Sequence, residues 1–253
     1  MRLSTIVERL DGELRTDAYA EIDASANGLQ VGPEEAEIER VATAVDTGRA
    51  TIEAAIEDGA DLLVAHHGLL WGGLDRITGR EYRLLERLIE EDLALYVSHL
   101  PLDGHRELGN AAGVADALGL EDRSPFGSLG DEHVGQTGRL PEPRSADDVR
   151  EVLDGFERDE PTTVLEFGSD PIETIGIITG SGTDWLSEAI AADLDALLTG
   201  EGKQQVYHPA REANVTVFLG GHYATETFGV RAIADLLESW GLETTYLPHP
   251  TGL

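Results

Sequence analysis

The chain alternates short apolar runs with amphipathic segments, and several of the runs end in a histidine. Residues 60–65 contain five apolar residues and are followed directly by His66 and His67. Such a run predicts a buried strand that passes into a loop at the histidines. Since neighbouring side chains of a strand point to opposite faces, both rings can serve one site only if the chain turns there, and Gly68 offers the conformational freedom for that turn.

Two further apolar runs are each followed by a histidine and, four positions later, by a carboxylate. If a helix begins near Tyr223, the histidine and the carboxylate of the second pair lie one turn apart on the same face and can bind one ion. Such donors favour a metal site, and a hydrogen-bonded pair in a loop is the alternative for residues 66–67. The two pairs are His99 with Asp103, after residues 94–97, and His222 with Glu226, after residues 215–219.

Pro101 changes the expected geometry of the first pair. Proline lacks a backbone donor and restricts the residue before it, so Asp103 should reach its target from a loop. His99 mirrors His222 in position, which suggests that its ring lies in the same cleft and bonds a metal-bound water or Asp103. A core histidine that bonds only to the backbone is the alternative.

The chain also repeats itself weakly. Residues 41–68 align without gaps on residues 175–202, with identities that include Asp61 with Asp195. Both copies predict strand, glycine turn, helix, strand and loop. We therefore expect an α/β fold of two related, intertwined halves with mixed sheets and a metal cleft between them, in which ligands lie beyond the carboxyl ends of strands.

The predicted first and second halves span residues 1–120 and 172–253. Between them, residues 121–171 are punctuated by Gly and Pro and predict a connecting or inserted segment. Within this segment we expect a helix from Ser145, as its N-cap, to about Phe156, and then a β-rich run.

Together the motifs resemble the Nif-three-like family, also called the GTP cyclohydrolase I type 2 family. In that family a pair of metal ions is bound by the positions that match His66, His67, Asp103, His222 and Glu226. The resemblance therefore implies an intact dinuclear site, and it also implies a homo-oligomer, a hexameric ring whose metal sites face an interior cavity. The matching stretches are residues 27–31, 59–68, 99–103, 107–110, 199–201, 208–212 and 221–226.

The donor set points to two ions without the resemblance. A structural zinc ion takes four ligands that are usually rich in Cys, and the chain has no Cys. Three histidines and two carboxylates, with His99 in addition, are too many for one such ion and suit two divalent ions about 3.5–4 Å apart. Nitrogen and oxygen donors admit zinc, manganese or iron. Water bound at such a centre becomes hydroxide at neutral pH, which points to hydrolysis.

The charge balance limits the classes of partner. The chain has 49 acidic residues against 18 Lys and Arg, a formal net charge of −31, and Lys203 as its single lysine. Acidic residues scattered over predicted helix faces suggest adaptation to a salty cytoplasm that screens their repulsion. Direct nucleic-acid binding is not expected, because a phosphate backbone needs Lys and Arg contacts. No apolar run reaches membrane-span length and the N-terminus lacks a signal peptide, so we expect a cytoplasmic protein with no membrane partner.

The candidates for catalysis are His99, Glu201 and His208. Glu201 would be a general base at a strand end or else an exposed helix-capping carboxylate, and His208 lies on a helix predicted to begin near Gln204. We expect a metal-dependent hydrolase of an unidentified small C–N or phosphoester substrate. The family name implies GTP cyclohydrolase activity, although basic residues for a triphosphate are few. The alternative is a non-enzymatic metal-binding scaffold or metal chaperone that acts through a protein partner.

Overall fold

The structure, a computed structural model, describes residues 1–33, 35–73, 76–158 and 160–252. It divides into two compact units, each built on its own mixed sheet. The expected α/β class with mixed sheets is therefore confirmed. No helix among the described residues is both long enough and apolar enough to cross a membrane.

Each unit is assembled from two parts of the chain. Unit 1 contains residues 1–102 and 229–249, and unit 2 contains residues 103–228 and the C-terminal residues from Pro250. The chain passes from unit 1 to unit 2 within one helix and returns to unit 1 within another, before its last residues join unit 2 at Pro250. These helices are α4 (Leu100–Gly104) and α10 (Thr227–Ser239).

Unit 1 is built on a five-stranded sheet in the order β1-β4-β3-β2-β11. The strands β4, β3, β2 and β11 are parallel, and β1 pairs with β4 in the antiparallel direction. Parallel neighbours place their carboxyl ends at one edge of the sheet, where ligands usually bind in such folds. The strands are β1 (Gly28–Val31), β2 (Arg40–Asp46), β3 (Leu62–His67), β4 (Ala94–Val97) and β11 (Glu243–Tyr246).

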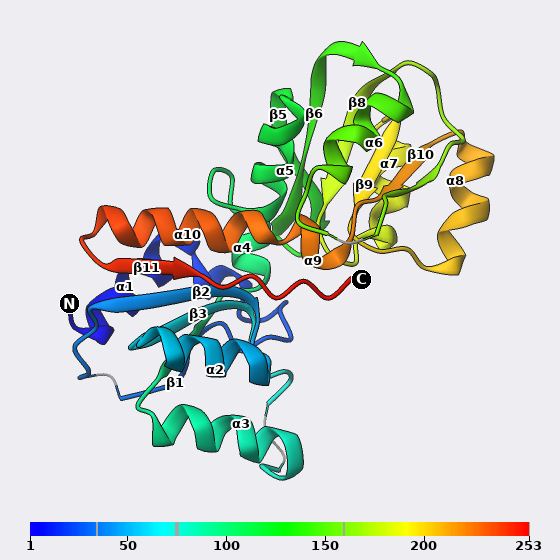
Figure 1. The fold of residues 1–253 in the computed structure, drawn as a ribbon. Coiled ribbons are helices and arrows are strands. Elements are labelled where there is room, and N and C mark those ends of the chain that lie inside the picture. Colours follow the sequence, from blue (N-terminus) through cyan, green and yellow to red (C-terminus); the bar gives the residue numbers. More distant parts are fainter. Residues whose placement is uncertain (34, 74–75, 159, 253) are drawn as a thin grey trace. The chain divides into compact units, whose positions relative to one another are not determined.

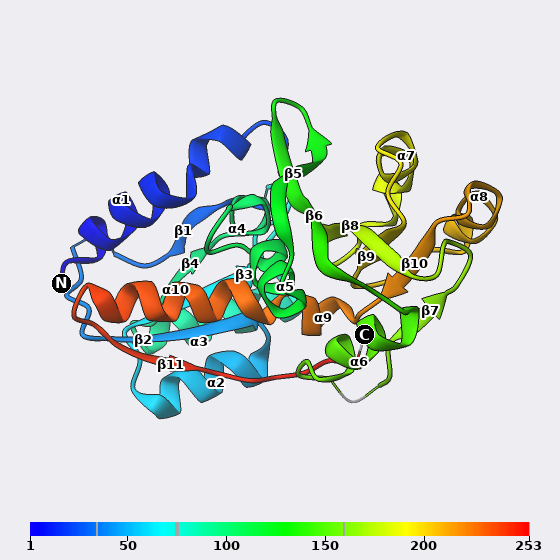
Figure 2. The same cartoon turned by 90° about the horizontal axis from the view of Figure 1, so that it is seen from above.

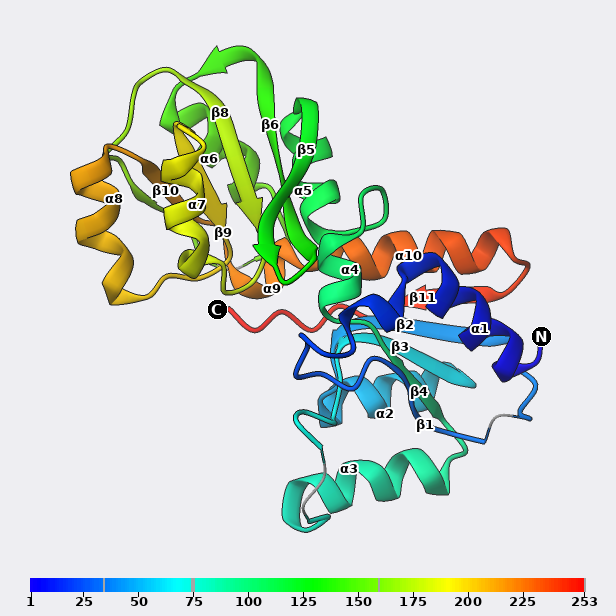
Figure 3. The same cartoon turned by 180° about the vertical axis from the view of Figure 1, so that it is seen from behind.

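Helices cover both faces of this sheet, which explains why its inner strands are continuous apolar runs. The helices α2 and α3 pack on one face through a buried cluster that includes Ile52 and Leu88. On the other face lie α1 and α10, as Figures 1 and 3 show. Besides α10, the helical segments of this unit are α1 (Leu3–Leu14), the 3-10 turn η1 (Thr16–Tyr19), α2 (Arg49–Asp58) and α3 (Gly79–Glu90).

Unit 2 is built on a six-stranded sheet in the order β5-β6-β8-β9-β10-β7. The three strands β8, β9 and β10 are parallel, while β5, β6 and β7 extend them in antiparallel pairings. The carboxyl ends of the three parallel strands again share one edge. The strands are β5 (Glu121–Leu129), β6 (Glu132–Arg144), β7 (Thr163–Leu165), β8 (Ile172–Ile178), β9 (Ala196–Thr199) and β10 (Thr216–Leu219).

The sheet of unit 2 is also covered on both faces. The helices α5 and α6 pack on one face, where Val114 and Leu153 belong to the same buried cluster as Phe218 of the sheet. Figure 2 shows α7 and α8 on the other face. The helical segments are α5 (Asn110–Leu118), α6 (Ala146–Asp154), η2 (Thr183–Trp185), α7 (Leu186–Ala191), η3 (Gln204–Val206), α8 (Tyr207–Ala213) and α9 (His222–Thr225).

The internal repeat is confirmed at the level of single hydrogen bonds. The predicted order of strand, helix and strand is found as β2-α2-β3 and as β8-α7-β9. In unit 1 the carboxylate of Asp61 accepts from the backbone N–H groups of residues 39–40, at 2.8 and 2.9 Å. In unit 2 the aligned Asp195 accepts from residues 173–174, both at 2.9 Å. The two aspartates therefore tie the start of one strand to the next in the same way.

The segment predicted as a connection forms part of the sheet of unit 2. Residues 121–171 supply β5, β6, α6 and β7. The helix expected after Ser145 is confirmed, because the Ser145 hydroxyl accepts from the backbone N–H of Asp148 at 3.1 Å and caps α6. The β-rich run is confirmed as β7, which pairs with β10.

Candidate metal-binding site

Three histidines of unit 1 gather at the carboxyl edge of its sheet. His66 and His67 are the last two residues of β3, and His99 follows β4 by two positions. One ring nitrogen from each residue lies within 4.8 Å of the others. The ring centroid of His66 is 4.6 Å from that of His67 and 5.2 Å from that of His99. The three imidazoles therefore form a cluster that could hold a metal ion.

The expectation that the strand ends before the two histidines was wrong. The strand β3 continues through His67, which pairs with Asp46 of β2 in the parallel register. The expectation for Gly68 was also wrong, because its φ angle is not positive. A Cβ atom at Gly68 would lie 2.5 Å from the Val97 side chain and 2.6 Å from that of Gln30. Glycine is needed here because neighbouring side chains leave no space.

Each ring of the cluster is held through its Nδ1 atom by an oxygen. A backbone carbonyl and ionised carboxylates can only accept, so Nδ1 is the donor in each of these contacts, and Nε2 is the ring nitrogen that would bind an ion. This is the arrangement that orients metal-binding histidines in proteins. The Nδ1 contacts are His66 to the carbonyl of Ser98 at 2.9 Å, His67 to Asp46 at 2.8 Å, and His99 to Asp23 at 2.9 Å.

Asp23 is a buried carboxylate that sequence reasoning missed. Its side chain is 1% exposed. Burial raises its pKa, but hydrogen bonds from His99, Asn27 and the backbone N–H of Ser25 outweigh burial, and the net pKa is below the usual value. Asp23 also accepts from the backbone N–H of Leu100 at 3.0 Å. In the sequence, the sign of this role was that Asp23 lies four residues before Asn27, whose side-chain amide donates to the Asp23 carboxylate at 2.8 Å.

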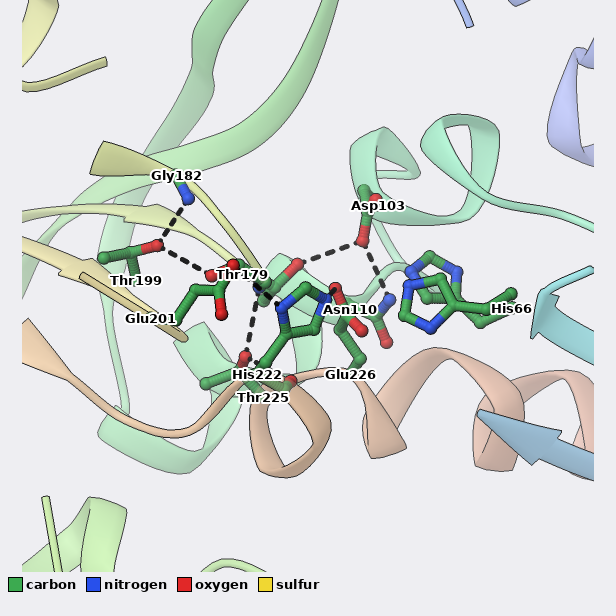
Figure 4. Close-up of polar contacts among 12 residues, drawn as sticks. His66, Asp103, Asn110, Thr179, Gly182, Thr199, Glu201, His222, Thr225 and Glu226 are labelled. Atoms are coloured by element: carbon green, nitrogen blue, oxygen red, sulfur yellow. Dashed lines mark hydrogen bonds and ion pairs between the residues drawn. The ribbon is translucent and has the colours of Figure 1, made fainter. Parts of the chain in front are cut away.

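In unit 2, His222 and Glu226 are arranged as the sequence predicted. The helix α9 begins at His222, and Glu226 follows one turn later. The Nε2 atom of His222 lies 3.3 Å from a carboxylate oxygen of Glu226 (Figure 4). Gly180, with a φ of +58°, passes close by, and a Cβ atom there would lie 2.2 Å from the same Glu226 oxygen. A residue without a side chain is therefore required beside this pair.

Asp103 lies in the same unit and is held by two donors. The hydroxyl of Thr179 donates to it at 3.0 Å and the amide of Asn110 at 2.9 Å (Figure 4). The expectation that Asp103 projects from a loop was wrong, because it lies in α4. Pro101 occupies the first turn of that helix, where a backbone N–H has no partner within the helix and its loss costs nothing.

The carboxylates of Asp103 and Glu226 are close together and buried. They offer oxygen atoms within 4.8 Å of one another, and the two residues are 6% and 2% exposed. Two like charges at this distance in a buried setting are costly unless a cation lies close to both. The chemistry of this donor set therefore fits a divalent metal ion, as do the oriented imidazoles of unit 1.

Of the other two candidates for catalysis, Glu201 lies beside His222, whereas His208 lies on α8 beside Tyr207. The carboxylate of Glu201, 45% exposed, lies 3.5 Å from Nδ1 of His222. Its backbone N–H donates to the carbonyl of Gly180 at 2.9 Å, which fixes the chain beside the metal-ligand candidates. His208 lies on α8, as expected, with its ring 5.3 Å from that of Tyr207. Within the described part of the chain, no hydrogen bond joins His208 to the donors of unit 2.

Comparisons with known proteins assign the chain to a family. The family model Duf34/NIF3 (NGG1p interacting factor 3) matches residues 1–250. A GTP cyclohydrolase 1 type 2 homolog of Halobacterium salinarum is 53% identical over 255 residues, which cover all of both chains. The solved structures of protein ybgI and of TTHA1606 from Thermus thermophilus cover the chain completely and are themselves fully covered, with TM-scores of 0.91 and 0.88 at 29% and 39% identity. The chain therefore belongs to the Duf34/NIF3 family.

Proposed function

We propose that the chain is a dinuclear metal-binding protein and a metal-dependent hydrolase of a small C–N or phosphoester substrate. The observation that carries the proposal is the set of oriented donors, three imidazoles in unit 1 and two close, buried carboxylates in unit 2. The proposed ligands are His66, His67, Asp103, His222 and Glu226, shared by two divalent ions of zinc, manganese or iron.

In the proposed reaction the metal ions would supply the nucleophile, and side chains of the protein would transfer protons. If held by these residues, divalent ions would lower the pKa of a water molecule and so would supply hydroxide at neutral pH. In the chain, Glu201 is the carboxylate that can accept or return a proton, because it is 45% exposed and 3.5 Å from His222. His99 lies in the imidazole cluster, where it offers Nε2 to an ion or to a bound water. Its predicted bond to Asp103 stays a prediction.

The names of the relatives point to one substrate, GTP, whereas the residues of this chain indicate only a broader class of substrate. Relatives at 53% and 42% identity are named GTP cyclohydrolase 1 type 2 homolog. A triphosphate would need several Lys or Arg side chains, and the chain has 18 in total against 49 acidic residues. The scarcity of basic residues counts against a triphosphate substrate, which leaves as second candidate a non-enzymatic metal-binding scaffold or metal chaperone that acts through a protein partner.

One experiment tests both proposals. Protein purified in molar KCl without chelator should contain about two divalent ions per chain, by elemental analysis. The variants His66→Ala, Asp103→Ala and Glu226→Ala should each lose at least one ion with an unchanged circular dichroism spectrum. A metal content below one after loading would contradict the dinuclear centre. Full metal content without turnover of C–N and phosphoester substrates, GTP included, would favour the scaffold.

The assembly state belongs to the same proposal. We propose a homo-oligomer, a hexameric ring, and adaptation of its acidic surface to high salt. Closed rings of identical subunits suit proteins with internal repeats. Light scattering in molar KCl should give a mass near six chains, and a monomer there would contradict the ring. Low salt is unsuitable for this measurement, because a net charge of −31 can separate subunits by repulsion.

A further inference from the structure

A tryptophan with an accessible ring lies beside the imidazole cluster of unit 1. Trp71 is 42% exposed. Its ring centroid lies 5.0 Å from that of His99, with the planes at 75°, and 6.2 Å from that of His67. Among the described residues, Trp71 is a large exposed apolar side chain whose ring contacts two of the three histidines of the cluster.

A hydrogen bond of its own ring nitrogen holds the indole of Trp71 in place. Its Nε1 atom donates to the carbonyl of Gly68 at 3.0 Å, which turns the polar edge of the ring towards the chain. The ring cannot rotate away without losing this bond, and the residue is 42% exposed in this position. Trp71 therefore holds a partly exposed aromatic ring in place beside the imidazole cluster.

The backbone around the tryptophan is fixed as well. Trp71 forms a bridge with Ser25, and the next N–H, that of Gly72, donates to the carbonyl of Ala24 at 2.7 Å. The amide oxygen of Gln30 accepts from the backbone N–H groups of residues 69–70 at 2.9 and 3.2 Å. Residues 69–72 are thus held by residues 24–25, which precede β1, and by Gln30 of β1 itself.

We propose that Trp71 is a stacking surface for a planar nitrogen heterocycle of the substrate, such as a purine base. This inference rests on the proposed function and adds the substrate class to it. Stacking on an indole requires no positive charge, which suits a chain that has 18 basic residues against 49 acidic ones. A ring stacked on Trp71 would lie next to His67 and His99, where the C–N bonds of a heterocycle meet the proposed metal site.

The test measures the binding of guanosine, which carries the ring without a phosphate, by isothermal titration calorimetry in molar KCl. The variant Trp71→Leu should weaken binding about 5- to 150-fold, the range expected for loss of one base–aromatic stack, while Trp71→Phe should retain part of it. Tyr82→Leu is the matched control, because Tyr82 is another exposed aromatic residue of the same unit, on α3. Ribose should not bind to any of these proteins.

Metal content and mass are measured on every protein, and the titration is done with and without metal. Wild-type protein that does not bind guanosine, or a Trp71→Leu variant that binds it as tightly as wild type, would overturn the inference and leave the metal site intact. A Trp71→Leu variant with a changed oligomeric mass would overturn it in favour of a contact between two copies of the chain. A wild-type protein that holds no metal would contradict the proposed function and not this inference. In that case the guanosine titration of the metal-free proteins still decides the role of Trp71.

Discussion

At the scale of single residues, the candidate site depends on groups that hold the ligands as much as on the ligands. Asp46 and Asp23 each accept from the Nδ1 atom of one histidine. Neither aspartate stands out in the sequence, because the partners are 21 and 76 positions apart. The histidines could be predicted from their places after apolar runs, but pairings across such distances follow only from the folded chain.

Asp46 provides a direct test of this orientation. The variant Asp46→Ala removes the acceptor of His67 and should weaken metal binding about 10- to 100-fold, as expected for loss of a group that orients a ligand. Asp46→Asn keeps one oxygen that can accept from Nδ1, so its loss should be smaller. Metal affinity is measured by competition with a chelator, and thermal unfolding of the metal-free proteins is the control. Equal affinities for the two variants would contradict the role of the acceptor.

Gly180 tests the space beside the carboxylate of Glu226. A Cβ atom at Gly180 would lie 2.2 Å from that carboxylate, so Gly180→Ala should displace Glu226 and reduce metal content. Gly119 has a similar positive φ of 72° but no neighbour within 4 Å of its added Cβ. The matched variant Gly119→Ala therefore carries the backbone strain alone, about 1–2 kcal/mol. Metal content by elemental analysis should fall only in Gly180→Ala, and an equal fall in both would mean that strain is the cause.

At the scale of elements, the repeat was the part of the fold that the sequence showed best. The alignment of Asp61 with Asp195 predicted equivalent positions, and the two carboxylates bind equivalent backbone groups. The role of residues 121–171 could not be predicted, because antiparallel strands such as β5 and β6 have exposed positions and interrupted apolar patterns. The helical position of Asp103 was missed because Pro101 resembles a helix breaker unless the helix start is known.

The aspartate of the second repeat should contribute measurably to stability. Burial raises the pKa of Asp195, but the bonds from Ser169 and from the backbone N–H groups of residues 173–174 outweigh burial and lower it. Asp195→Ala should therefore cost about 1–2 kcal/mol at pH 7. Since the folded-state pKa is depressed, this contribution is present above about pH 4, the usual pKa of an aspartate, and is lost as pH falls through the folded-state value.

Urea unfolding at constant molar KCl measures that contribution at pH 7 and at several values below about pH 4. Glu212→Ala is the control, because Glu212 is exposed on α8 of the same unit. The stability difference between wild type and Asp195→Ala should shrink as the solution is acidified, while the control stays near wild type throughout. A difference that is constant with pH would mean that the Asp195 charge has no part in the effect.

At the scale of the whole molecule, the net charge of −31 should make stability depend on salt. Repulsion between exposed carboxylates extends over about 10 Å at 0.1 M salt but only about 3 Å at 1 M. The variant with Glu8→Gln, Glu212→Gln and Asp235→Asn removes three exposed charges and should raise the melting temperature in 0.1 M KCl. In about 2 M KCl, where repulsion is screened, the variant and the wild type should unfold at the same temperature. An equal gain at both salt concentrations would show that the substitutions act locally, through helix propensity, and that screening of the acidic surface is not what stabilises the protein in salt.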